Sequence, residues 1–215
     1  MDDLAKVQLP NVFNPYAEFC NVHDKEDAAA LRRNNLCLAL TASAEFGTDS
    51  IWFGRDFGWR GGRRTGLSLT DEGHLPAMRG MLRAPKLAKA TTGPVMAERT
   101  ATVVWGVALR LPTPPVMWNA FPLHPHDLDN PLTNRAHSPA ERKMTAWTID
   151  VLVQRLKPAR LVAIGNDAAK ALSHMGFAFE QVRHPSYGGQ RDFIQSMETL
   201  HSLAPSSGQP DLFAA

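Results

Sequence analysis

The sequence has little cysteine, no long apolar run and almost no net charge. Its 215 residues include two cysteines, Cys20 and Cys37, too few for an iron–sulfur cluster, which usually takes four thiolates. We expect both to be buried, reduced thiols. No apolar run approaches the roughly 18 residues that span a bilayer, and the first residues, MDDLAK, are acidic and lack a signal-peptide core. We therefore expect neither a membrane protein nor an exported one, but a cytoplasmic protein.

Positive charge is concentrated locally, although the formal net charge is only +2. The stretch GRDFGWRGGRRTG, residues 54–66, holds five glycines and four arginines around a single acid, Asp56. A basic face on a nearly neutral protein favours a partner that carries phosphates. The alternative is that these arginines are merely solvated surface residues.

The alternation of short apolar segments with helical patterns predicts an α/β fold. We expect a three-layer α/β/α sandwich with a central, mainly parallel four-stranded sheet, in one domain over residues 1–203. The expected strands are 50–54, 115–122, 159–165 and 179–186, with 103–111 as a further strand or extended segment. The expected helices are 25–46, 138–158, 166–176 and 191–203. Residues 71–100 have no sustained period and predict a long excursion with one short helix.

Local signals support two of these helices. Ser138 and Glu141 have the spacing of a capping box, and Pro158 ends the same helix. Asn166 is the expected N-cap of the following helix. The tryptophans at 52, 105, 118 and 147 are expected in the core.

Polar side chains stand at the ends of three predicted strands. Asp56 follows the first strand, Asn119 ends the second and His184 ends the fourth. Ligands of open α/β sheets bind beyond the carboxyl ends of the strands. We therefore expect a carboxylate, an amide and an imidazole to converge on one crevice. Taken singly, each has a structural alternative: a turn cap, a buried loop amide or a packed turn histidine.

These strand ends resemble the motifs of the uracil-DNA glycosylase superfamily. The first motif of its best-known branch is GQDPYHGPGQAHGL, and residues 54–67 read GRDFGWRGGRRTGL in the same register. The second motif, LLLNA, corresponds to MWNA with Asn119, and the third, HPSPLS, corresponds to HPSYGG with His184. Order and spacing also fit, so the resemblance covers about residues 50–200.

The resemblance implies roles for these residues. Asn119 would present an acceptor and a donor to the N3–H and O4 edge of a flipped-out uracil, a pattern opposite to that of cytosine. His184 would hydrogen-bond O2, and Asp56 would orient or deprotonate the attacking water. Further base-binding residues would be Gly54, Arg55, Phe57 and Leu69. DNA-binding residues would be Arg60, Arg63, Arg64, Ser186, Tyr187, Gly188 and Gln190.

Departures from the best-known branch indicate a divergent one that lacks an iron–sulfur cluster. The family tyrosine that excludes the 5-methyl group of thymine is replaced by Gly58, so Phe57 or Trp59 would have to take its place. The stacking aromatic aligns with Leu69, and Phe57, Trp59 or Phe121 could supply stacking instead. The intercalating leucine aligns with Gly188, and Tyr187 or Gln190 could fill the gap.

We expect no cofactor and no metal. The segment LHPHDLDN, 123–130, holds two histidines and two aspartates, but it lacks the framework of a usual metal site, and we expect a polar loop near DNA.

The tail, residues 204–215, carries a second signal. Gln209, Leu212 and Phe213 stand in QPDLF, which resembles the pentapeptide that binds the bacterial sliding clamp, with Pro210 in place of the usual leucine. The preceding APSSG would serve as a flexible tether. A chance match in a disordered tail is the alternative.

The leading hypothesis is a monomeric, nucleoid-associated DNA glycosylase that hydrolyses the N-glycosidic bond of uracil and leaves an abasic site. Two alternatives are a DNA-binding member of the fold with little catalysis and a small-molecule nucleoside or nucleotide hydrolase that uses the Gly/Arg loop for phosphates.

Overall fold

A four-stranded parallel sheet forms the centre of the molecule. The computed structural model describes residues 2–206. The sheet contains β2 (Ser50–Asp56), β3 (Val116–Phe121), β5 (Arg160–Ile164) and β6 (Glu180–Val182), in the order β3-β2-β5-β6. Every neighbouring pair is parallel. The predicted sheet is confirmed, and β2 continues two residues beyond the expected strand, to Asp56.

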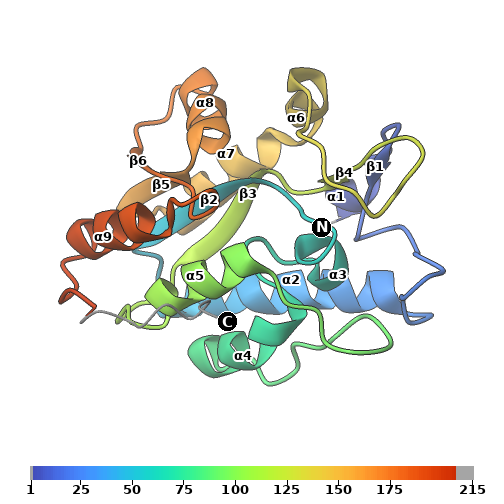
Figure 1. The fold of residues 1–215 in the computed structure, drawn as a ribbon, viewed down its shortest axis with the longest axis horizontal. Coiled ribbons are helices and arrows are strands. Elements are labelled where there is room, and N and C mark those ends of the chain that lie inside the picture. Colours follow the sequence, from blue (N-terminus) through green and yellow to red (C-terminus); the bar gives the residue numbers. More distant parts are fainter. Residues whose placement is uncertain (1, 207–215) are drawn as a thin grey trace.

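Helices cover both faces of this sheet (Figure 1). On one side lie α6 (Pro139–Thr145), α7 (Trp147–Leu156) and α8 (Asn166–His174). On the other lie α2 (Ala28–Phe46), α3 (Gly62–Thr65), α4 (Leu75–Leu82) and α5 (Arg99–Ala108), with α9 (Gln190–Leu200) packed against α5. The predicted three-layer sandwich is thereby confirmed. The remaining elements are α1 (Asp2–Ala5), the 3-10 helix η1 (Glu72–His74), and an antiparallel pair of β1 (Val12–Phe13) with β4 (His124–Pro125).

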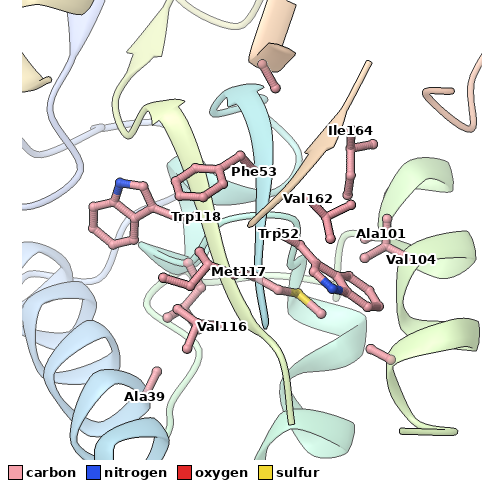
Figure 2. Close-up of a cluster of buried hydrophobic side chains, with 14 of the residues drawn as sticks. Ala39, Trp52, Phe53, Ala101, Val104, Val116, Met117, Trp118, Val162 and Ile164 are labelled. Carbon is pink, nitrogen blue, oxygen red and sulfur yellow. The ribbon is translucent and has the colours of Figure 1, made fainter. Parts of the chain in front are cut away.

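The central strand β2 is buried on both of its faces, which explains its continuous apolar run. Figure 2 shows Trp52 beside Ala101 and Val104 of α5, whereas Phe53 points to the other side of the sheet, near Trp118. Trp52 and Phe53 are both fully buried. Burying a side chain of this size stabilises a fold by roughly 1.5–3 kcal/mol. The sheet therefore holds the strand ends on a rigid support.

One predicted strand is a helix. Residues 103–111, expected to be extended, fall largely in α5, which runs from Arg99 to Ala108. The helix is buried on most of its circumference, including Val103, Val104, Trp105 and Val107. The residues of α5 that are not buried include Thr102 and Gly106, which carry no charge, so the sequence pattern did not separate this helix from a strand.

Two other element predictions need correction. The expected helix 138–158 consists of α6 and α7, which meet at Ala146, although its capping box at Ser138 and Glu141 is present. The N-cap of α8 is Gly165 and not Asn166. Gly165 has a φ of +87°, a conformation that side chains disfavour, and it turns the chain sharply from β5 into the helix. The short helix expected within 71–100 is α4.

Two predictions of burial are wrong. Cys20 is buried as expected, but Cys37 is exposed on α2, and both thiols are free. Trp52, Trp105 and Trp118 are buried, whereas Trp147 at the start of α7 is 38% exposed. No helix within residues 2–206 is long and apolar enough to cross a bilayer. The QPDLF segment lies outside the described residues.

Candidate active site

A cavity of about 720 Å³ opens at the carboxyl edge of the sheet. Asp56 of β2, Asn119 of β3 and His184, two residues after β6, all line it. The three side chains that the sequence placed at strand ends therefore meet at one cavity. Parallel strands produce this result because their carboxyl ends share one edge of the sheet.

Asn119 is buried and carries an unused acceptor. Its side chain is 2% exposed, and its Oδ1 has no hydrogen-bond partner among the described residues. A buried polar atom without a partner costs roughly 1–3 kcal/mol, which a ligand with an N–H donor would recover. Gly54 makes this arrangement possible, because a Cβ atom there would lie 2.5 Å from Oδ1 of Asn119 and 2.8 Å from Cδ2 of Leu69.

Asp56 is held through one of its two carboxylate oxygens. Oδ2 accepts hydrogen bonds from Nε of Arg55 at 2.9 Å and from the backbone N–H of His137 at 3.1 Å. Nδ1 of His137 lies 3.2 Å from the same oxygen. Because a carboxylate only accepts, this nitrogen carries a proton. These contacts all end on Oδ2, which leaves Oδ1 for a water or ligand in the cavity.

His184 is set as a neutral hydrogen-bond donor. The backbone N–H of Ser186 donates to Nδ1 of His184 at 3.2 Å, so the proton of the neutral ring lies on Nε2. Burial, with the charge of Arg55 as a smaller cause, lowers the pKa of His184. The imidazole packs against Gly165, where a Cβ atom would lie 3.1 Å from that of His184. The side chain is therefore suited to donate to a carbonyl oxygen without carrying a charge.

The apolar wall of the cavity includes Phe57 and Leu69. Phe57 is 2% exposed, and a Cβ atom at Gly62 would lie 2.2 Å from its ring, so the glycine provides the room for this phenyl group. Trp59 and Phe121, the other aromatic candidates for stacking, do not line the cavity. Phe121 is fully buried and packs on the ring of His137 at 5.4 Å.

The arginines of the Gly/Arg loop differ in their exposure and in their contacts. Arg55 lines the cavity, but it pairs with Asp56 and, at 3.6 Å, with Asp167. Arg60 is exposed and its guanidinium lies 4.9 Å from the ring centre of Trp59. Its exposure leaves the predicted contact of Arg60 with DNA a prediction.

Arg63 and Arg64 were predicted to contact DNA, and the structure contradicts this, because they are only 2% and 4% exposed. Arg63 stacks on Phe13 at 3.7 Å, and Arg64 pairs with the buried Glu72 at 3.2 Å. Their charges are used inside the protein, where no phosphate can reach them.

The loop after β6 forms the lip of the cavity. Ser186 and Tyr187 line it, whereas Gly188 and Gln190 do not. Tyr187 is 98% exposed and has a φ of +51°, an uncommon value for a residue with a side chain. The loop thus displays an exposed aromatic ring at the cavity that His184 also lines.

Several residues that line the cavity or contact Asp56 were not predicted from the sequence. Glu98 and Asn134 belong to segments without a regular pattern. His137, which contacts Asp56, lies 81 residues away in the chain. The one signal in the sequence that could have drawn attention to His137 is its position just before the N-cap of a helix. Asp167 follows β5, and the rule that found the other strand ends could have found it.

The histidines of segment 123–130 take structural roles. Nη1 of Arg63 lies 3.0 Å from Nδ1 of His124, whose Nε2 donates to the carbonyl of Thr133. His126 contacts the carbonyl of Asp127. Within the described part of the chain, no three His, Cys, Asp or Glu side chains form a group that could hold a metal ion.

Comparison with known proteins gives a fold and no family. No protein-family model matches the chain, and no curated protein matches its sequence. Among solved structures, the fold is similar to that of SMUG2 from Pedobacter heparinus. The TM-score is 0.58 at 11% identity, over 94% of this chain and 96% of that one. At this identity the likeness establishes the shared fold.

Proposed function

We propose that this protein is a DNA glycosylase that removes uracil by hydrolysis and leaves an abasic site. The observation that carries the proposal is the buried, unpartnered Oδ1 of Asn119 in the cavity shared with Asp56 and His184. An amide presents an acceptor and a donor side by side, which matches the N3–H and O4 edge of uracil. The fold shared with SMUG2 supports the same class of reaction.

The chemistry follows from the three side chains. Water, oriented by Oδ1 of Asp56, attacks C1′ of the flipped nucleotide, and its oxygen bonds to C1′ as the C1′–N1 bond breaks. The bonding electrons leave with the base, whose negative charge spreads to O2, where Nε2–H of His184 donates. The ionised Asp56 also stabilises the positive charge that develops on the sugar. A proton from the attacking water passes through Asp56 to solvent, and the departing base takes up a proton.

The surface around the cavity supports a DNA substrate over a free nucleoside. Tyr187 projects from the lip and is the side chain best placed to enter the gap that an extruded base leaves in the duplex. Lys170 lines the cavity and the exposed Arg60 lies on the loop that borders it, where they could approach the flanking phosphates.

The test uses a labelled oligonucleotide with a single uracil, followed by alkaline cleavage of abasic sites. We expect scission by the wild type and a loss of rate of about 10²–10³-fold in His184→Ala, because one fixed donor to the leaving group is removed. His174→Ala, an exposed histidine of α8 that does not line the cavity, is the matched control. Absence of scission, or undiminished scission by an Asn119→Asp/His184→Ala double variant, would refute the proposal. Cleavage of free deoxyuridine at a comparable rate would instead favour a small-molecule hydrolase.

A further inference from the structure

Glu98 places a carboxyl group over the glycines of the Gly/Arg loop. A Cβ atom at Gly58 would lie 3.0 Å from Oε1 of Glu98, and a Cβ atom at Gly61 would lie 2.4 Å from Oε2. Neither glycine has a positive φ. The carboxyl group of Glu98 therefore fills the space next to both glycines, and a side chain would conflict with it strongly at Gly61 and slightly at Gly58.

The backbone of Glu98 is held by a hydrogen bond to Asp71. Its backbone N–H donates to Oδ2 of Asp71 at 2.6 Å, and Asp71 is fully buried. The other oxygen of Asp71 accepts from the backbone N–H of His74 and so caps η1. Glu98 itself precedes the first residue of α5. A buried hydrogen bond and a helix start thus hold this residue at one place on the wall.

Glu98 also faces the cavity that contains Asp56 and Asn119. Burial, followed by the negative charge of Asp71, raises the pKa of Glu98; the nearby positive charge of Arg60 opposes this shift, and the charge of Asp56 adds to it. The carboxyl group is therefore more readily neutralised than an exposed one, and it can border a bound base without the full cost of a buried charge.

We propose that Glu98 is a specificity-determining residue that closes the cavity against substituents on the base. This assignment rests on the proposed function. With His184 at O2 and Asn119 at N3–H and O4, the part of the pyrimidine left to face the remaining wall is the C5–C6 edge. Gly58 offers no side chain there, and the carboxyl group of Glu98 occupies the space above it. A group attached to C5 therefore meets Glu98.

The experiment compares oligonucleotides that carry uracil, 5-bromouracil or thymine at one position. Glu98→Ala opens the wall, and we expect it to raise kcat/KM for the 5-substituted bases relative to uracil by about 10-fold or more, the usual effect of one methyl-sized group in a fitted pocket. Glu98→Gln keeps the size of the side chain and leaves this ratio unchanged. The bases differ in their intrinsic reactivity as leaving groups, but this difference is the same for all variants. A change in the ratio of kcat/KM values therefore reports the contact between the base and residue 98.

Gly58→Ala provides an independent test of the same contact. In the wild-type background its Cβ pushes against Glu98 and lowers activity on uracil, whereas in the Glu98→Ala background the added methyl group refills the wall and restores the preference for uracil. Glu26→Ala, an exposed acid that does not line the cavity, is the control. If Glu98→Ala does not fold, Glu98→Asp shortens the side chain by one methylene and should shift the ratio in the same direction.

The outcomes separate the two proposals. A wild type that releases no uracil would overturn the glycosylase function and this assignment with it. An active wild type whose base preference is the same in Glu98→Ala, or in Glu98→Asp where that variant is needed, would overturn the assignment of Glu98 alone. An equal change of ratio in Glu98→Gln would also overturn it, because the charge and not the size of the side chain would then matter.

Discussion

Asp56 depends on a neighbour that is remote in sequence. His137 contributes two groups to the same carboxylate oxygen, its backbone N–H and Nδ1. The imidazole is 4% exposed and packs on Phe121. Because the contacts of Arg55 and His137 all end on Oδ2, the carboxylate of Asp56 cannot rotate freely, and the orientation of Oδ1 is fixed. We infer that His137 is a positioning residue for the proposed reaction.

Replacing His137 tests this role. We expect His137→Phe to lower kcat by roughly 10–150-fold with KM nearly unchanged, because one hydrogen bond to a charged group, worth roughly 1.5–3 kcal/mol, is lost at the reacting carboxylate. His137→Asn places an amide N–H close to the position of Nδ1 and should recover most of the loss. Single-turnover kinetics on the uracil oligonucleotide measures both effects.

A purely structural role of His137 would give another result. Both substitutions would then reduce the amount of folded protein, and kcat per active site, titrated with an abasic-site oligonucleotide, would stay at the wild-type value. Equal losses of kcat in His137→Phe and His137→Asn would also contradict positioning by a donor at Nδ1.

The residues at the carboxyl ends of strands were predictable, and those on the crossing loops were not. Asp56, Asn119 and His184 follow short apolar runs, and the geometry of a parallel sheet brings such positions together. Glu98 reaches the cavity, and His137 reaches Asp56, through long connections whose path depends on packing. Arg63 and Arg64 were wrongly predicted to contact DNA. The sequence shows their positive charge, but it does not show that Arg64 pairs with the buried Glu72 or that Arg63 stacks on Phe13.

At the scale of the helix, the start of α6 fixes His137. Ser138 is the N-cap of α6: its hydroxyl accepts from the backbone N–H of Glu141, and its own backbone N–H donates to Oε2 of Glu141. Arg135 donates two hydrogen bonds to the carboxylate of Glu141 and so stabilises the same turn. The hydrogen bonds that Glu141 accepts, above all those from Arg135, lower the pKa of Glu141 to about 2. The residue just before this cap is therefore held at a fixed place against Asp56.

Removing the cap should affect both stability and catalysis. We expect Ser138→Ala to lower the free energy of unfolding by about 0.5–2 kcal/mol, the usual cost of losing an N-cap. We also expect a smaller loss of kcat than in His137→Phe, because the backbone N–H of His137 moves with the first turn. Urea denaturation and single-turnover rates test the two parts, with Ser138→Asp, another good N-cap residue, expected to stay near the wild type. A normal kcat in a destabilised Ser138→Ala protein would show that the cap does not orient His137.

The ends of helices were predictable where a local capping motif sets them, and not where they depend on packing against other parts of the fold. The capping box of α6 is a signal within four residues, and the sequence shows it. The break at Ala146 between α6 and α7 has no glycine or proline to mark it. The less buried residues of α5 include Thr102 and Gly106, which carry no charge, so the sequence did not mark its outer face as polar.

At the scale of the whole molecule, buried charged side chains connect the Gly/Arg loop to other segments of the chain. Arg64 pairs with Glu72, and Arg63 lies between Phe13 and His124. Arg32 pairs with Asp24 and donates from Nε to the carbonyl of Arg64. Breaking one partner of such a pair leaves a buried charge uncompensated. These contacts fix the loop that carries Asp56, so part of its positive charge serves the fold rather than a ligand.

His124 makes the stability of this arrangement depend on pH. Burial, followed by the charge of Arg63, lowers its pKa to about 3, against 6.5 for an unperturbed histidine. As the pH falls below 6.5 the unfolded chain takes up a proton at His124, whereas the folded protein does not until about pH 3. The free energy of unfolding should therefore decrease with falling pH across this range, by about 1.4 kcal/mol per pH unit from this residue.

We expect a loss of about 2 kcal/mol from His124 between pH 6.5 and 5.0, measured by urea denaturation at both values. His124→Gln keeps polar atoms near Arg63 and the carbonyl of Thr133 but cannot titrate, so its loss over the same interval should be smaller by this amount. Other groups titrate in both proteins, and the difference between the two slopes isolates His124. Identical slopes would mean that the folded protein takes up the proton, and that Arg63 and His124 are not held together as the structure places them.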